Sequence, residues 1–282
     1  MGRTENINVF QDTMNLCKNN DRIRESVHNS AEGQKLILEG DAIAEPDKKR
    51  YKEKARITVS KKRTFEAALG YRGTKTAVHN FASASNPGGG VERGANAQEE
   101  CLCRCSGLFK CLNVSDAWSG FYMAHRAEHN PIHNDDIIYT PDVLVFKSDT
   151  VKPELMEEAD WYNVDVITCA APNLREKPSN AFNTGDGKDA IKITDKDLLA
   201  IHEKRLRRIL DVALSNKVET IVLGAFGCGA FMNNPNVVAQ ASKNVVNEYL
   251  YAFKNIEFAV YCSPKDDTNY RIFDRVLKPY TK

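Results

Sequence analysis

The sequence predicts an α/β fold in which helices cover both faces of a mixed β-sheet. Short β-branched and aromatic runs alternate with longer amphipathic segments through the second half of the chain. The run at residues 219–225 is almost continuously apolar, which indicates a central strand buried on both faces. Glycine-containing loops follow two of the predicted strands and lead into helices, and α/β sheets bind ligands at such loops.

The N-terminal part of the chain differs in composition from the rest. Residues 1–55 are rich in Asn, Lys, Asp and Glu and are predicted to form a helical extension in front of a main domain at residues 56–282. Amphipathic spacing favours helices over residues 6–18 and 21–37. Acidic residues interrupt the lysine-rich run at 47–54, which is typical of a solvated face and leaves direct nucleic-acid binding open.

The main domain is predicted to begin with a short strand at residues 57–59 and a helix over 64–69. Gly70 is a usual stop for that helix. A strand over 76–81 comes next, and good helix formers resume from about residue 95.

Three histidines follow in residues 118–134. His125 and His129 have the spacing of a helical metal site, but Pro131 interrupts the pattern before His133. A surface helix and loop is therefore the interpretation that the spacing favours.

The rest of the chain continues the alternation of strands and helices. Thr-Pro-Asp separates the first two β-rich runs, which suits either successive edge strands or one bent strand. Asp195 is expected to cap the long helix that it begins. Strands are predicted at residues 136–139, 143–146, 164–169, 219–225 and 256–262, and helices at residues 195–216, 236–253 and 269–277.

The first glycine loop contains Asn86 and the triplet Gly88-Gly89-Gly90. Three successive glycines favour positive φ angles or a close approach to the main chain. Glu99 and Glu100 lie in the first turn of the following helix, whose N-terminus is a ready anion site. The residues alone leave a second interpretation open, a plain turn whose acidic residues complement the helix dipole.

The second glycine loop spans residues 224–234 and also joins a strand to a helix. Two such loops indicate a phosphate-bearing ligand. Neither loop has the Lys-Ser/Thr of a Walker motif or the glycine spacing of a Rossmann fingerprint.

Composition excludes several classes of protein. With 42% hydrophobic and 27% charged residues and a formal charge of +1, the chain is typical of an ordinary globular protein. Its apolar runs are too short for a membrane span and its first residues lack the apolar segment of a secretion signal, so we expect a cytoplasmic location.

The eight cysteines are expected to be buried thiols rather than disulfides. Cys101 and Cys105 share a helix face, but no Cys-x-x-Cys or nearby histidine pair completes a tetrahedral set. We therefore expect neither a metal nor another cofactor.

Taken together, these motifs resemble the bacterial-type poly(ADP-ribose) glycohydrolases, which are built on a macrodomain. The signature of that family is a glycine triplet, a spacer and Gln-Glu-Glu. Here a seven-residue spacer joins Gly88-Gly89-Gly90 to Gln98-Glu99-Glu100, and the resemblance extends roughly over residues 55 to 280. Further matching positions are Asn86-Pro87, Gly94-Ala95, Arg104-x-Ser106, Tyr139-x-Pro141-Asp142-Val143, Ala171-Pro172-Asn173 and Gly224 to Phe231.

The resemblance implies a macrodomain-like fold, poly(ADP-ribose) as substrate and ADP-ribose as product. It implies that Glu100 is the catalytic acid/base, that Glu99 orients the ribose being cleaved, and that Phe231 lies on a ribose. The remaining substrate contacts that it implies are Asn86, Gly88, Gly89, Gly90, Gln98, Gly227, Cys228, Gly229 and Ala230.

Helix geometry limits the mechanism. Most glycosidases place two carboxyl groups about 5 Å, or about 6.5 to 9.5 Å, apart across the bond. Neighbouring residues on a helix point about 100° apart, so Glu99 and Glu100 do not form that pair. A single-carboxylate mechanism is the more consistent hypothesis.

Two other functions remain open from the sequence. One is a hydrolase that removes single ADP-ribose units from modified protein or DNA. The other is a module that binds ADP-ribose without cleaving it, although such a module needs the loops and not the acid at Glu100.

Overall fold

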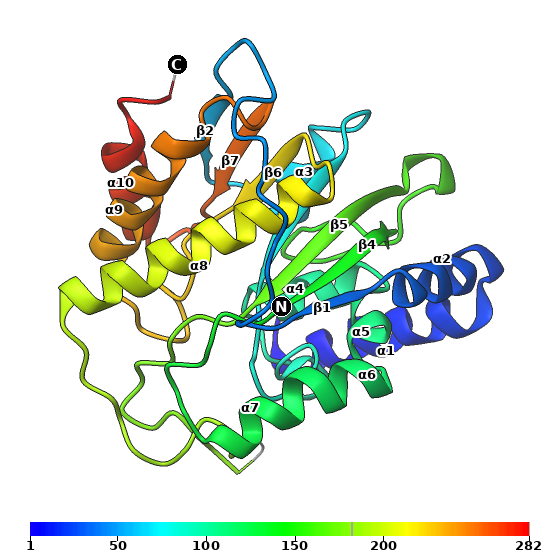
Figure 1. The fold of residues 1–282 in the computed structure, drawn as a ribbon. Helices are drawn as coiled ribbons and strands as arrows, with labels where there is room; N and C mark the ends of the chain where they lie inside the picture. Colours follow the sequence, from blue (N-terminus) through cyan, green and yellow to red (C-terminus); the bar gives the residue numbers. More distant parts are fainter. Residues whose placement is uncertain (182, 282) are drawn as a thin grey trace.

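The computed structural model describes residues 1–181 and 183–281, which form a seven-stranded mixed sheet with helices on both sides (Figure 1). The strand order is β1-β4-β5-β3-β6-β7-β2. Only β4 runs against the other strands in this part of the chain. The strands are β1 (Lys35–Ile37), β2 (Arg56–Ser60), β3 (Thr76–Phe81), β4 (Ile137–Val145), β5 (Tyr162–Cys169), β6 (Thr220–Leu223) and β7 (Asn255–Ala259).

The helices confirm most of the predicted segments. The α3 prediction, residues 64–69, is reproduced, and α4 begins shortly after the expected point. The helices are α1 (Arg3–Asn19), α2 (Asp21–Glu32), α3 (Thr64–Leu69), α4 (Gln98–Cys105), α5 (Leu108–Leu112), α6 (Ser115–Ala117), α7 (Met123–Glu128), α8 (Asp195–Ser215), α9 (Pro235–Val246) and α10 (Thr268–Leu277). Short turns lie at η1 (Val91–Arg93), η2 (Trp118–Tyr122), η3 (Glu158–Asp160) and η4 (Asn247–Tyr249).

The core lies on both faces of the sheet, as the apolar strands indicate. Alternate residues of one strand belong to different hydrophobic clusters: Ile221 packs with α8, α9 and α10, whereas Val222 packs with α3, α4 and α5. Ala77 and Val78 of β3 divide in the same way. This alternation follows from the two-residue period of a strand and confirms the predicted burial of the central strands.

The predicted helix over residues 21–37 is wrong in its last part. The helix ends at Glu32, and Lys35–Ile37 instead pairs with β4 as an edge strand. Gly33 follows the helix end in close contact with β4, because a Cβ atom there would lie 2.8 Å from Pro141 Cγ. The N-terminal segment therefore completes the sheet, and the division of the chain at residue 55 stays a prediction.

Strand β4 contains Thr-Pro-Asp, where the sequence left open either two successive edge strands or one bent strand. The two runs form one strand with a bulge between Thr140 and Val143. Asp142 has a φ of 51°, and its N–H donates to Asp165 Oδ1 over 3.0 Å. The bulge bends the strand without ending it.

The long helix α8 is capped by a different residue from the one expected. Thr194 is the cap, since its Oγ1 accepts a hydrogen bond from Asp197 N over 3.1 Å, and Asp195 is the first helical residue. This corrects the predicted role of Asp195.

The predicted surface position of the histidine segment is wrong for two of its three histidines. His125 and His133 are buried, whereas His129 is exposed. The His125 ring lies 2.8 Å from both Phe121 O and Asn134 Oδ1, and His133 Nδ1 lies 2.8 Å from Ala171 O. Internal hydrogen bonds offset the cost of burying these rings.

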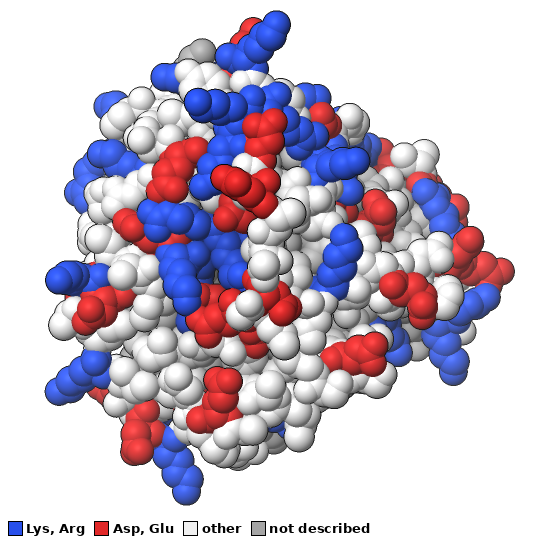
Figure 2. All heavy atoms as spheres, viewed as in Figure 1, with Lys and Arg blue, Asp and Glu red and all other residues white. Residues whose placement is uncertain are grey.

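The surface mixes charges of both signs, as the formal charge of +1 suggests (Figure 2). Within the described ranges, no helix is long and apolar enough to cross a bilayer.

Candidate active site

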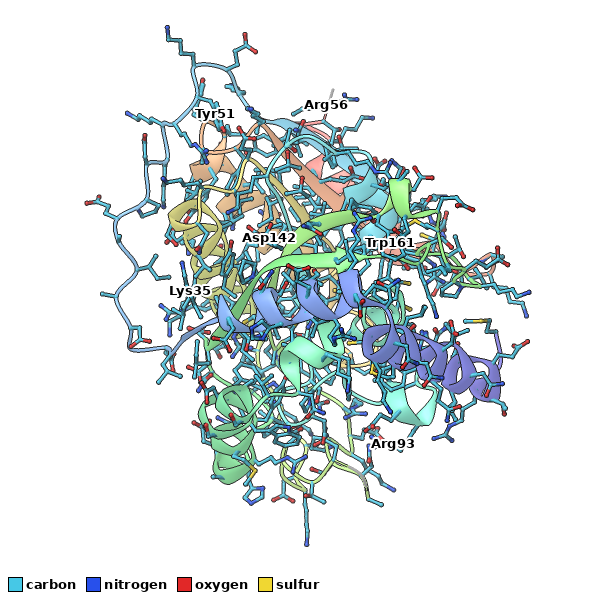
Figure 3. All side chains as sticks on the ribbon, turned by 90° about the vertical axis from the view of Figure 1, so that its right-hand side faces the viewer. Lys35, Tyr51, Arg56, Arg93, Asp142 and Trp161 are labelled. Atoms are coloured by element: carbon cyan, nitrogen blue, oxygen red, sulfur yellow. The ribbon has the colours of Figure 1, made fainter. Side chains whose placement is uncertain are left out.

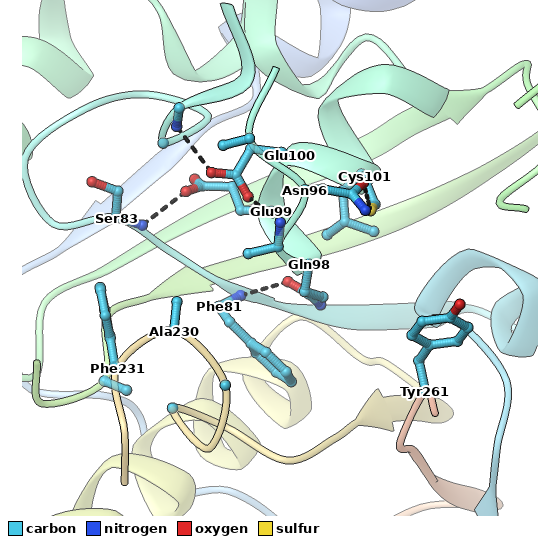
Figure 4. A pocket seen from close by; sticks show the side chains of 18 of the residues that line it. Phe81, Ser83, Asn96, Gln98, Glu99, Glu100, Cys101, Ala230, Phe231 and Tyr261 are labelled. Atoms are coloured by element: carbon cyan, nitrogen blue, oxygen red, sulfur yellow. Dashed lines mark hydrogen bonds between the residues drawn. The ribbon is translucent and has the colours of Figure 1, made fainter. Parts of the chain in front are cut away.

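A pocket of about 1020 Å³ lies at the carboxyl ends of β3, β6 and β7 (Figure 4). Three of its lining residues come from these strand ends: Phe81 is the last residue of β3, Ala225 follows β6, and Tyr261 follows β7. The two predicted glycine loops meet here, because parallel strands present their carboxyl ends at one edge of the sheet.

The glycine triplet shapes the wall beside the two glutamates. Gly89 has a φ of +58°, and a Cβ atom there would lie 2.6 Å from Glu100 Oε1 and 3.2 Å from Glu99 Oε2. Only glycine fits this close approach. Gly88, by contrast, is buried below the pocket, where a Cβ would lie 2.8 Å from Phe109 Cδ2, so it supports the loop without lining the pocket.

Glu100 is held at the pocket wall by main-chain groups. Its Oε1 accepts a hydrogen bond from Gly90 N and its Oε2 accepts one from Ala97 N, each over 2.9 Å. As the third residue of α4, it reaches back to the helix start as capping-box acids do. Each oxygen keeps a second lone pair, so the carboxyl can carry a proton in this position.

Glu99 is buried more deeply, with an exposed fraction of 3%. Its Oε2 accepts a hydrogen bond from Ser83 N over 2.8 Å and its Oε1 accepts one from Asn80 Nδ2 over 3.2 Å. Burial, and then the charge of Glu100, raise the pKa of Glu99 to about 8. Glu99 therefore retains its proton at neutral pH.

Gln98 and Asn86 line the pocket but are engaged with the protein. Gln98 Oε1 accepts from Phe81 N over 2.9 Å, while its Nε2 donates to His79 O over 2.7 Å. These bonds fix the start of α4 on the end of β3. Asn86 Oδ1 accepts from Arg126 Nη2 over 2.5 Å.

The second glycine loop forms the opposite wall, and Asn233 holds its shape. Asn233 Nδ2 lies 3.1 Å from Gly227 O and 3.2 Å from Phe231 O. Gly227 has a φ of +77° and packs against Ala171, whereas a Cβ on Gly229 would meet nothing within 4 Å. The open side of this loop therefore faces the pocket.

The side chains of Phe231 and Cys228, two further predicted contacts of this loop, point to different surroundings. Phe231 lines the pocket, and the guanidinium carbon of Arg175 lies 5.6 Å from its ring centroid. The side chain of Cys228 packs against the core, and burial raises the pKa of its thiol. A ligand would meet only the main chain of Cys228.

Several residues that line the pocket were not predicted from the sequence. Arg175 follows the Ala171-Pro172-Asn173 motif, and that proximity was a usable signal. The guanidinium carbon of Arg63 lies 4.0 Å from the Tyr261 ring centroid, an arrangement that no local pattern predicts. The other polar residues in this group are Arg3, Thr64, Ser83, Arg93, Asn96, Asp149, Asn180, Asn183 and Asn269.

The cysteines of α4 are structural. All eight thiols of the chain are free, and Cys101, Cys103 and Cys105 are buried, which raises the pKa of each. Within residues 1–181 and 183–281, no three His, Cys, Asp or Glu side chains are grouped to hold a metal ion.

The fold and the site define a mixed α/β protein with a ligand-sized pocket that contains two buried glutamates. The family described as "Microbial-type PARG, catalytic domain" matches residues 4–148, and the chain belongs to that family. No curated protein matches the chain.

Solved structures agree over nearly the whole chain. The poly(ADP-ribose) glycohydrolase of Deinococcus radiodurans, in complex with ADP-ribose, is 30% identical, with a TM-score of 0.75 over 90% of this chain and 97% of that one. The poly(ADP-ribose) glycohydrolase of Thermomonospora curvata is 29% identical, with a TM-score of 0.79 over 97% of this chain and 100% of that one. The same enzyme bound to the inhibitor ADP-HPD is 28% identical, with a TM-score of 0.77 over 97% and 99% of the two chains.

Proposed function

We propose that this protein is a poly(ADP-ribose) glycohydrolase that cleaves the ribose–ribose bond of the polymer and releases ADP-ribose. One observation carries the proposal: the Glu99–Glu100 pair lies on the pocket wall between two glycine loops, in a chain of this family. The loops offer main-chain N–H groups to a diphosphate, and the fold is macrodomain-like.

Glu100 acts as the single acid/base. Its carboxyl donates a proton to the 2′-oxygen of the departing ribose while the bond from that oxygen to the anomeric carbon breaks. An oxocarbenium ion forms at the anomeric carbon. Water then attacks this carbon, and the ionised Glu100 takes the proton that the water loses, which restores the starting state.

The other residues bind and orient the substrate. Glu99 forms hydrogen bonds to the ribose being cleaved, while Asn80 and Ser83 fix its position. Gly227 to Phe231 surround the diphosphate, and Phe231 lies against a ribose. Asn86, Gly89, Gly90 and Gln98 shape the ribose side of the pocket.

Substitution of the acid tests this assignment. Glu100→Gln keeps the shape of the side chain and removes the proton donor, so we expect a loss of at least about a hundredfold in kcat, since general acid–base catalysis contributes ~10²–10⁴-fold. Binding of ADP-ribose, measured by calorimetry, should persist. Glu128→Gln, at an exposed glutamate of α7, is the control.

The measurement is the release of free ADP-ribose from poly(ADP-ribose), followed by chromatography without added metal. A loss smaller than about tenfold would remove Glu100 from the catalytic role. If the wild type releases nothing from the polymer, the same assay on mono-ADP-ribosylated protein and DNA decides between a different linkage and a binding module.

We also propose that the protein works in the cytoplasm. Eight free thiols, six of them buried, suit a reducing compartment. Fractionation of cells, with the protein detected by antibody, tests this location.

A further inference from the structure

Two arginines lie at the glutamate end of the pocket and take no part in the mechanism above. Arg93 comes from the turn after the glycine triplet, and Arg3 comes from the first turn of α1. A Cβ atom on Gly90 would lie 3.7 Å from Glu100 Oε1 and 3.9 Å from Arg93 Nη2. The catalytic carboxyl and this guanidinium group therefore border the same small space.

Side chains of helix α1 donate hydrogen bonds to main-chain carbonyl groups of this turn. Arg3 Nε donates to Arg93 O over 2.6 Å, and the buried Asn6 Nδ2 donates to Gly94 O over 3.0 Å. Gly94 has a φ of +74°, and a Cβ there would lie 2.3 Å from Arg3 O. Arg93 lies on the flank of the molecule that carries the N-terminal helices (Figure 3). Arg3 is thus placed at the pocket rim by tertiary structure.

The substrate continues past Glu100. In the proposed reaction, the bond that Glu100 cleaves joins two ADP-ribose units, and the loops at 86–90 and 227–231 hold one of them. The other unit leaves from the Glu100 side and carries its own diphosphate. The pocket volume of about 1020 Å³ lies at the upper end of the ~300–1,000 Å³ range of small-molecule sites.

We propose that Arg3 and Arg93 form a subsite that binds the diphosphate of the departing polymer unit, an inference that rests on the proposed function. Guanidinium groups bind phosphate oxygens through paired N–H donors, and such charge-assisted bonds are the strong ones. The subsite makes the enzyme prefer polymer to substrates whose leaving group lacks a phosphate.

The preference is measured as a ratio of kcat/KM values. One substrate is poly(ADP-ribose), and the other is ADP-ribose that carries nitrophenol on its anomeric carbon, in the same configuration as the polymer. We expect the polymer-to-nitrophenyl ratio to fall about tenfold in Arg3→Gln and further in the double variant with Arg93→Gln. Arg24→Gln, on the exposed surface of α2, is the matched control and should keep the wild-type ratio.

Salt dependence gives a second readout. Each lost phosphate contact should make log kcat/KM for the polymer less steep against log salt concentration. Equal losses on both substrates, or an unchanged ratio in the double variant, would overturn the subsite, because either result leaves these arginines a merely structural role.

Different experimental results would contradict the proposed function and the proposed subsite. If the wild type cleaves neither substrate, the hydrolase assignment fails, and the subsite is then tested by binding. In the Glu100→Gln background, calorimetry compares an ADP-ribose dimer with ADP-ribose itself. The dimer should bind about tenfold more tightly, and Arg3→Gln should remove that advantage. Equal affinities for dimer and monomer would overturn the subsite.

Discussion

Glu99 binds its proton more firmly in the folded chain than in the unfolded chain. Its pKa is raised from 4.5 to about 8 by burial and by the neighbouring Glu100. Between these two values the folded state binds more protons than the unfolded state, so the stability that Glu99 contributes falls as the pH rises. The contribution is fully present below about pH 4.5 and is lost as the pH rises through about 8.

We therefore expect Glu99→Gln to raise Tm above pH 8 and to flatten the decline of Tm between pH 5 and 8. The amide cannot ionise, and its oxygen can still accept the hydrogen bond from Ser83 N. Thermal unfolding at a series of pH values measures the effect. Glu157→Gln removes a negative charge from the exposed surface and serves as the control. A Glu99→Gln profile that runs parallel to that of the wild type would contradict the burial argument.

Gly89 offers a test of the close approach between loop and carboxyl. Ala at this position needs φ near +58° and places a methyl group 2.6 Å from Glu100 Oε1, so the carboxyl must move. A misplacement of about 1 Å can cost ~10²-fold in rate, and we expect a loss of that order in kcat.

Gly73→Ala is the matched control for this substitution. Gly73 also has a positive φ, +92°, but a Cβ there would meet nothing within 4 Å. It should lose about 1 kcal/mol of stability from backbone strain while keeping its activity. Similar kcat values in the two variants would show that the approach to Glu100 does not matter.

At the scale of elements, α1 packs against α4 on the side away from the pocket and is joined to it by a hydrogen bond. The buried Thr13 Oγ1 donates to Arg104 O over 2.6 Å and accepts from Lys147 Nζ over 2.9 Å. Lys147 also forms an ion pair with Asp12 over 2.7 Å. One hydroxyl therefore joins α1, the end of α4 and the segment after β4.

Thr13→Val keeps the shape of this side chain and removes its hydrogen bonds. Buried partners left unsatisfied cost ~1–3 kcal/mol, so we expect the free energy of unfolding to fall by that amount. Thr4→Val, at an exposed position of the same helix, should cost much less. Urea denaturation of both variants measures the difference, and equal values would show that α1 contributes no such anchor.

The whole sheet was largely predictable because its strands carry strong local signals. Ile221 and Val222 lie in an apolar run, which predicts a buried strand. Gly70 follows α3 as its C-cap, where the helical run of residues ends. Strand β1 was missed because three residues are too few to show a period of two. Gly33 was the available stop signal for α2.

The position of the two glutamates was predictable, and the position of Arg3 at the pocket rim was not. Glu99 and Glu100 lie a fixed distance along the chain from Gly88–Gly90, so a motif can show them. Arg3 reaches the same pocket only through the packing of α1 on Gly94, far away in sequence. His125 and His133 were misjudged because their partners come from the folded chain.

The pairing of β2 sets an order of assembly during synthesis. β2 lies at the edge of the sheet and pairs with β7, and Ile57 also forms a bridge to Thr281. A ribosome releases residues 56–60 long before residues 255–259, so this early strand emerges without its partner. We expect its backbone to stay open to other chains, and to chaperones, until residues 255–259 have emerged.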